Sequence, residues 1–233
     1  MTSTALHVVD DIATTEPAHA HFSATEFARR RRVVQDAMAA RGIDCLLITR
    51  LEDQYWLCGF DSGAASVFHV LFFTVEGRML HLSRSADLGN IAYTSQCRDA
   101  LVFDDAHGTS KGAAIKDVLA SLGMAGRTVG VETDSVGMSL ALHHDLRAGV
   151  DGWCELTDTS SLIRDIRRVK SQEELAFLRR AGEILGQASD AAIDMVKPGA
   201  FEGDLMAAFQ QTVFSADGEA FPGFPLGAGP RAF

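Results

Sequence analysis

The chain has 233 residues, of which 47% are hydrophobic and 22% are charged, as in an ordinary globular protein. Its formal net charge of −10 argues against a nucleic-acid partner, because phosphate binding needs a basic face. No run approaches the roughly 18 apolar residues that a membrane helix requires, so we expect no membrane partner. The four cysteines are widely spaced and form no C-x-x-C pair, which is typical of reduced thiols in a cytoplasmic protein.

Residues 1–21 are interpreted as a loose leader ahead of the first folded element. This stretch lacks the basic start and the apolar segment of a signal peptide. His19 and His21 lie in it, and their spacing would suit a metal only in an extended strand. We therefore interpret the two histidines as part of a solvated tail.

A first helix is expected after the leader. Ser23 and Glu26 form an S-x-x-E capping box, which marks a helix start, and Gly42 is placed to end that helix. Phe27, Val34 and Met38 share one face of it. The arginines of 29–32 lie mostly on the other face, where we expect a solvated surface.

The chain then alternates between strands and helices. The run IDCLLIT at 43–49 is apolar throughout, which indicates a strand buried on both faces. Further strands are expected at 66–75, 78–83, 100–103, 128–132 and 153–157. Helices are expected at 87–93, 110–122 and 135–147. Glu76-Gly77 is a two-residue turn that joins two of the strands as a hairpin. The pattern predicts an α/β domain, with a mixed sheet covered by helices.

The character of the sequence changes near Ser160, and we place a domain boundary near 162. Ser171 and Glu174 form a second capping box, which opens a helix expected at 171–196. Its apolar residues recur at helical spacing and are expected to face inward: Leu175, Leu178, Leu185, Ala188, Ala192 and Met195. A Lys-Pro-Gly sequence ends this helix, and a shorter helix is expected at 202–214. The Gly- and Pro-rich tail that follows is expected to be extended.

Five motifs in order resemble the creatinase, prolidase and Xaa-Pro aminopeptidase family. RGIDCLLIT and DQYWLCGFDS resemble segments of the family's N-terminal domain, and IRRVKSQEELAFLRRAGEI resembles the junction with its catalytic domain. KPGAFEGDL resembles the K-P-G-x-T-E-x-E element, although Phe201 replaces the usual threonine and so removes an N-cap oxygen. FPLGAGPRA resembles the turn ahead of the family's first active-site histidine, with Ala228 in place of serine.

This resemblance implies a creatinase-type N-terminal domain over 22–162, followed by the first helices of a pita-bread α+β catalytic domain over 163–233. It also implies hydrolysis of a peptide or small amide or amidino C–N bond by two divalent metal ions, manganese, cobalt or zinc. In the family the metal ligands follow the S-G-P turn, and this sequence ends at Phe233. We therefore expect no metal ligand and no catalytic residue here, interpret the chain as truncated, and predict that it is inactive alone.

The sequence offers little sign of a different active centre. The eight histidines form no H-E-x-x-H motif, and adjacent His143 and His144 diverge too far on a helix to share a metal. Asp104, Asp105 and His107 form the best local cluster, which we interpret as a solvated loop. The chain has neither a G-x-S-x-G nucleophile elbow nor a phosphate-binding glycine loop.

One site hypothesis remains, in the loop expected at 55–62. The resemblance implies a homodimer in which the N-terminal domain of one subunit forms a wall of the other subunit's active site. Phe60 and Asp61, flanked by two glycines, would then form part of a substrate wall in trans. The alternative is that they pack under the edge of the sheet, and the sequence does not decide between the two. For Tyr55 and Trp56 we expect packing.

Two functions remain open for the chain. The first is an incomplete metallohydrolase whose full-length form acts on a small peptide or amide substrate. The second is a non-catalytic binding or dimerisation module, a pseudo-peptidase of the kind found in chaperones. The acidic residues are scattered rather than gathered in a tail, which makes the second less favoured.

Overall fold

The computed structural model describes residues 6–8, 19–104, 110–219 and 226–227. The chain divides into two compact units, residues 1–169 and 170–233, and each is described by itself. This division falls seven positions after the boundary at 162 that the sequence suggests. In the described ranges, no helix is long and apolar enough to cross a membrane.

The first unit is built on a mixed sheet of seven strands in the order β1-β5-β4-β3-β2-β6-β7. The strands are β1 (Leu6–Val8), β2 (Cys45–Ile48), β3 (His69–Thr74), β4 (Met79–Ser83), β5 (Ala100–Phe103), β6 (Thr128–Val131) and β7 (Glu155–Asp158). β2, β6 and β7 run parallel to one another, whereas β3 is antiparallel to both β2 and β4. The predicted α/β fold with a mixed sheet is confirmed.

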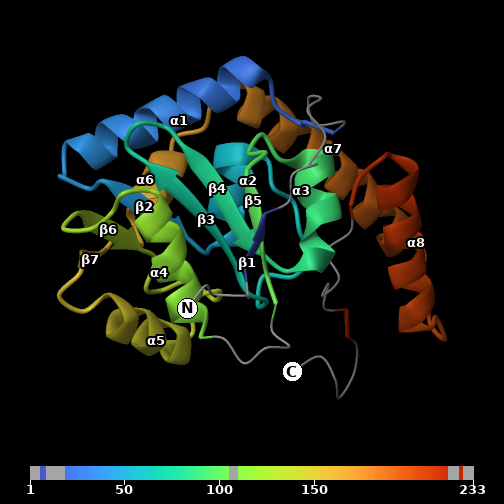
Figure 1. The fold of residues 1–233 in the computed structure, drawn as a ribbon. Helices are drawn as coiled ribbons and strands as arrows, with labels where there is room; N and C mark the ends of the chain where they lie inside the picture. Colours follow the sequence, from blue (N-terminus) through green and yellow to red (C-terminus); the bar gives the residue numbers. More distant parts are fainter. Residues whose placement is uncertain (1–5, 9–18, 105–109, 220–225, 228–233) are drawn as a thin grey trace. The chain divides into compact units, whose positions relative to one another are not determined.

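Helices cover both faces of this sheet (Figure 1). On one face lie α4 (Lys111–Ser121) and α5 (Leu140–Val150). On the other lie α1 (Ala24–Ala39), α2 (Leu51–Cys58), α3 (Leu88–Thr94) and α6 (Leu162–Arg167), and a short 3₁₀ helix, η1 (Ser85–Asp87), precedes α3. β2 and β3 are buried along their whole length, which explains why β2 is apolar throughout and β3 is apolar from Val70 to Phe73.

Local sequence signals account for most of these boundaries. Ser23 accepts a hydrogen bond from the backbone N–H of Glu26, and this starts α1 as predicted. Gly77, at φ 95°, turns the chain between β3 and β4, and Gln35 fills the space where a Cβ would lie. All four cysteines are free thiols, which agrees with the sequence interpretation.

Three predictions for the first unit are wrong. The segment from Tyr55 was expected to be a loop, but α2 extends through it to Cys58, because no glycine or proline stops the helix before Gly59. α5 begins at Leu140 rather than at 135, since Ser139 and not Ser135 caps it. Arg30 was assigned to a solvated face of α1, but it is fully buried.

Aromatic rings surround the Arg30 side chain. Its guanidinium carbon lies 3.9 Å from the ring centre of Phe22 and 5.1 Å from that of Trp56. It also forms an ion pair with Glu26 and donates a hydrogen bond to the carbonyl of Trp56. Paired and stacked in this way, a guanidinium is tolerated inside a protein.

Parts of the predicted leader are also structured. Leu6–Val8 form β1, which pairs with β5. His19 stacks on Tyr93, with ring centres 5.0 Å apart, and the Nδ1 atom of His21 lies 2.8 Å from the hydroxyl of Tyr55. The two histidines therefore contact tyrosines of α2 and α3.

The second unit contains two helices, α7 (Gln172–Ile193) and α8 (Glu202–Ser215). Ser171 and Glu174 form the predicted capping box in full, with both reciprocal hydrogen bonds. Phe201 is the N-cap of α8 and makes no side-chain cap hydrogen bond, as expected from the loss of threonine.

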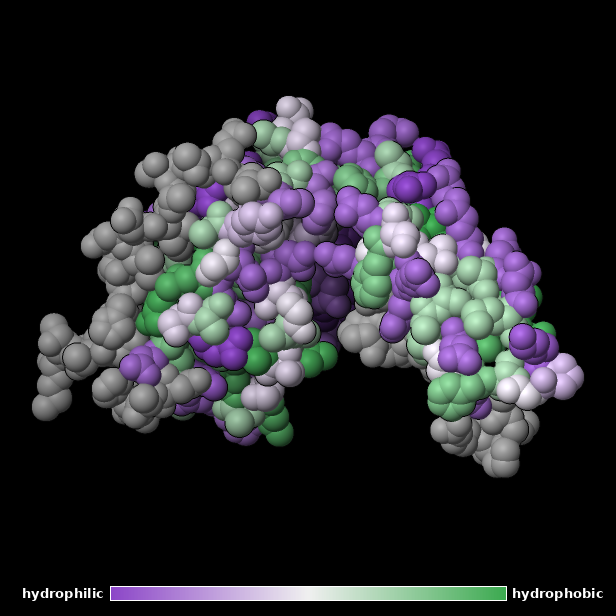
Figure 2. Space-filling model, turned by 90° about the vertical axis from the view of Figure 1, so that its right-hand side faces the viewer, coloured by the Kyte–Doolittle hydropathy of each residue, from purple (hydrophilic) through white to green (hydrophobic). Residues whose placement is uncertain are grey.

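The predicted inward face of α7 is only partly correct. Ala188 is buried, and it packs with Ile184 against Phe209 and Val213 of α8. However, Leu178 and Leu185 are each 53% exposed, because they lie outside the cluster in which Ile184, Ala188 and Ala192 pack against α8. Hydrophobic residues also lie among polar ones over the face of the molecule shown in Figure 2.

Candidate functional site

The predicted substrate-wall residues follow α2, which delivers the chain to the loop before β3. Gly59 ends this helix at φ 80°, and a Cβ there would lie 2.7 Å from the carbonyl oxygen of Thr94. Phe60 is fully buried, with its ring centre 4.9 Å from that of His81. Asp61 is half-buried, and its backbone N–H donates to the hydroxyl of Thr94. The ring of Phe60 thus anchors the loop, while Asp61 keeps some exposed surface.

A buried polar cluster lies beneath this loop. The Nε2 atom of His81 is 3.1 Å from the Ser95 hydroxyl and 3.8 Å from the Cys58 sulfur, and His69 Nδ1 is 2.9 Å from the amide nitrogen of Gln54. Burial lowers the pKa of His81 to about 3 and raises the pKa of the Cys58 thiol to about 11. Both groups are therefore neutral at physiological pH, and this thiol is not an activated nucleophile.

The structure gives no support for a metal centre within the residues it describes. No group of three or more histidine, cysteine, aspartate or glutamate side chains there is arranged to hold a metal ion. His143 and His144 lie on α5 with ring centres 6.5 Å apart. Two members of the Asp104 cluster, Asp105 and His107, lie outside the described residues. The described part of the chain does not fit a two-metal site.

A second polar site lies where the parallel strands β2, β6 and β7 end. The carboxyl ends of parallel strands meet at one edge of a sheet, where α/β proteins commonly place functional groups. Glu132 follows β6, and one of its carboxyl oxygens accepts hydrogen bonds of 2.7 Å from the backbone N–H groups of Thr49 and Arg50. The guanidinium of Arg50 contacts Asp53 at 3.5 Å, the carbonyl of Ser160 at 3.2 Å, and Asp134.

Two arginines of helix α6 also bind to the acidic side chains of this site. Arg167, near the end of α6, donates to the carboxylate of Asp53, and Arg164 donates to Asp134 at 2.7 Å. The Arg164 guanidinium is the main reason that the pKa of Asp134 is lowered to about 2, and Arg50 adds to the effect. The contacts therefore connect α2, the end of β6 and α6, which leads out of the first unit.

Sequence reasoning missed this site. Its members come from segments far apart, since Thr49 and Glu132 are separated by 83 positions. The sequence carries two relevant features. Glu132 is an acidic residue directly after a strand, and Asp53 is an acidic residue in the first turn of a helix. Neither signal indicates that the two side chains meet.

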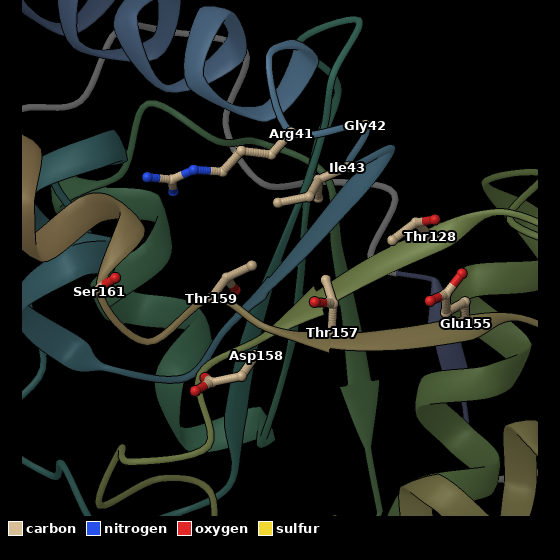
Figure 3. Close-up of a pocket in the computed structure, with 9 residues that line it drawn as sticks. All are labelled: Arg41, Gly42, Ile43, Thr128, Glu155, Thr157, Asp158, Thr159 and Ser161. Atoms are coloured by element: carbon tan, nitrogen blue, oxygen red, sulfur yellow. The ribbon is translucent and has the colours of Figure 1, made fainter.

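An open pocket of about 400 Å³ runs along the edge strand β7, from the amino ends of β6 and β7 to the residues that follow β7 (Figure 3). Its lining residues are polar for the most part: Arg41, Gly42, Ile43, Thr128, Glu155, Thr157, Asp158, Thr159 and Ser161. Arg41 extends over the pocket, and Glu155 lies next to Thr128 at the opposite end from Ser161. The lining has charges of both signs and four hydroxyl side chains, and it contains no histidine or cysteine.

Comparison with known proteins is consistent with this fold. Residues 30–169 match the Creatinase/Prolidase N-terminal domain family. The chain is 27% identical over 218 residues to the uncharacterised hydrolase/peptidase y4tM of Sinorhizobium fredii, covering 91% of this chain and 55% of that protein. It is 25% identical over 185 residues to the ectoine hydrolase of Halomonas elongata, covering 76% of this chain and 46% of that protein.

Solved structures show the same architecture. The X-Pro aminopeptidase of Thermotoga maritima superposes with a TM-score of 0.66 at 17% identity, covering 81% of this chain and 49% of that one. The fold and sequence together define an α/β domain of the creatinase and prolidase type, joined to the first helices of a pita-bread domain. The chain belongs to the Creatinase/Prolidase N-terminal domain family. It spans about half the length of the curated relatives it matches.

Proposed function

We propose that this chain contributes the N-terminal part of a hydrolase that cleaves a C–N bond in an X-Pro peptide or in a small amide or amidino compound. The observation that carries this proposal is the match to a hydrolase/peptidase over 91% of the chain. The ectoine hydrolase among the relatives widens the substrate class beyond peptides.

In this proposal the two divalent metal ions, manganese, cobalt or zinc, are not held by the described residues. When bound, such a pair would supply a metal-activated water at neutral pH. The role of this chain is to shape the substrate site of a partner copy in a homodimer, through the loop that follows α2. Asp61 would face the substrate, and Phe60 would hold the loop in place from beneath. We also propose that the protein is cytoplasmic, which suits its four free thiols.

The first test uses the purified 233-residue chain with manganese, cobalt or zinc. We expect no stoichiometric metal by mass spectrometry and no hydrolysis of an X-Pro dipeptide, ectoine or creatine. Stoichiometric metal together with turnover would show that this chain holds an active centre of its own.

The second test asks whether the loop contributes to a substrate site. Residues 1–169 of this chain would replace the corresponding domain of the Halomonas ectoine hydrolase, and Asp61→Asn would be introduced. We expect kcat/KM to fall at least ~10-fold, the effect of losing one hydrogen bond to a charged group. Asp36→Asn, on an exposed part of α1, is the matched control and should leave kcat/KM unchanged.

A non-catalytic dimerisation module is the second candidate. A folded, dimeric chimera that has full activity with Asp61→Asn would support this module and contradict the substrate wall.

A further inference from the structure

Two carboxyl groups are buried against one another at the polar edge of the sheet. Asp53 is 0% exposed and Glu132 is 3% exposed. Both carboxyl groups lie against Arg50, Asp53 at 3.5 Å from its guanidinium and Glu132 at 2.7 Å from its backbone nitrogen, and the interaction with Asp53 helps to raise the pKa of Glu132. A hydrogen bond between two carboxyl groups needs a proton on one of them, because two carboxylates have only acceptors. Two ionised carboxylates at this position would also repel each other with little water to screen them.

The charged groups around the pair lie on α2, on α6 and after β6 and β7. The ion pairs of the two carboxyl groups go to Asp53, which contacts Arg50 at the start of α2 and Arg167 of α6. Arg164 of α6 pairs with Asp134 after β6, and the exposed Asp158 at the end of β7 joins the network through Ser160. Glu132 accepts instead from two backbone N–H groups.

We propose that Asp53 and Glu132 hold one proton between them and that this proton fastens helix α6 to the sheet. Glu132 carries the proton and donates it in a hydrogen bond to Asp53. The Asp53 carboxylate accepts from Arg167 of α6 at the same time. When the proton leaves to solvent, Asp53 loses its donor and is repelled by a second negative charge. This repulsion displaces Asp53 from the position in which it accepts from Arg167, so the attachment of α6 weakens.

The direction of the pH effect follows from Glu132. Burial raises the pKa of Glu132 to about 8, and the hydrogen bond to Asp53 contributes further. In the unfolded chain a glutamate has a pKa of about 4.3. Between these values the folded protein keeps a proton that the unfolded chain has lost. The stability of the folded state should therefore fall as pH rises through this range and should level off above pH 8.

The first experiment is urea unfolding of the whole chain from pH 6.5 to 7.5. In this window a buried histidine such as His81 stays neutral in the folded protein but titrates in the unfolded chain, so the effect of Glu132 is measured as the difference between the wild type and Glu132→Gln. We expect the unfolding equilibrium constant to rise ~10-fold more over one pH unit in the wild type than in Glu132→Gln, as the release of one proton requires. Asp53→Asn, which provides Glu132 with a neutral donor, should have the same pH dependence as Glu132→Gln.

Glu155→Gln, an exposed glutamate on the neighbouring strand β7, is the matched control and should retain the full pH dependence. A wild-type profile parallel to that of Glu132→Gln would overturn the shared proton.

The wild-type protein also allows a test that needs no variant to fold. A ¹³C-labelled glutamate carboxyl signal should titrate near pH 8, and its absence would contradict the proposal.

The attachment of α6 needs a separate readout. Hydrogen exchange, corrected for intrinsic rates, would compare the amides of α6 with those of β3 at pH 6.5 and 8.5. On going from pH 6.5 to 8.5, we expect α6 to lose more protection than β3 in the wild type. In Glu132→Gln the two elements should lose the same amount of protection. If α6 and β3 lose the same amount in the wild type, the proton stabilises the fold without fastening α6, and that part of the proposal is overturned.

Discussion

The two units of the chain bury their apolar residues very differently. In the first, both faces of the sheet are covered, and residues such as Leu47 and Phe72 have no exposed surface. In the second, the buried cluster consists of Ile184, Ala188, Phe209 and Val213. Since stability follows buried contacts, local opening should require much less free energy in α7 and α8 than in the sheet.

The largest expected effect comes from opening a cavity in the first unit. Phe72→Ala removes a fully buried ring from the middle of β3, and we expect a loss of about 3–5 kcal/mol in the free energy of unfolding. Urea denaturation followed by circular dichroism measures it. Leu185→Ala, at a 53% exposed position in the second unit, is the control and should cost less than about 0.5 kcal/mol. Equal losses of unfolding free energy in Phe72→Ala and Leu185→Ala would contradict the contrast between the units.

Acid should also weaken the first unit through His81. Burial lowers its pKa to about 3, whereas an unfolded histidine has a pKa near 6.5, so its contribution is present above pH 6.5 and is lost on acidification. In the wild type Glu132 has the opposite slope from about pH 4.5 to 6.5, so the two effects oppose each other there. The effect of His81 should therefore be measured in the Glu132→Gln background.

From pH 6.5 to 5.0, Glu132→Gln should lose about 1.6 kcal/mol more than the double variant Glu132→Gln/His81→Gln. The glutamine introduced by His81→Gln would preserve a polar group near Ser95 without titrating. Parallel pH profiles for the two variants would mean that His81 does not contribute.

In the second unit the matching core substitution should act locally. Ile184→Ala removes part of the small cluster between α7 and α8, and we expect a loss of about 2 kcal/mol, at the low end for such a change. Hydrogen exchange should show faster exchange throughout α7 and α8 with unchanged protection in β2 and β3. Leu178→Ala, at an exposed position on the same helix, is the control. Equal loss of protection in β3 would mean that the units unfold as one.

Most of the fold was predictable because its signals are local. The capping residues Ser23, Ser110 and Ser171 mark helix starts by direct hydrogen bonds to nearby N–H groups. Apolar runs such as 70–73 indicate buried strands without reference to the rest of the chain. The errors concern tertiary effects. Arg30 is buried because Phe22 and Trp56 surround it, and no periodicity within α1 indicates this.

The candidate site was less predictable for the same reason. Phe60 and Asp61 were found through a resemblance in a short motif, and their role in a substrate wall stays a prediction. The Asp53–Glu132 pair depends on the pairing of β2 with β6, which brings together residues far apart in the sequence. A buried acid pair of this kind is recognised only when the register of the strands is known.

The smallest expected effect concerns the start of α8. Phe201 occupies the N-cap position with extended backbone angles, φ −91° and ψ 130°, which suit a capping serine. Its ring is 68% exposed, so little buried area is lost on replacement. Phe201→Ser should stabilise α8 by about 0.5–1 kcal/mol, because its hydroxyl can accept from an N–H group of the first turn. Hydrogen exchange in α8 that is slower in Phe201→Ser than in the wild type would show this gain. Phe201→Ala is the control, because alanine has no cap oxygen. Equal exchange in Phe201→Ser and Phe201→Ala would contradict the capping argument.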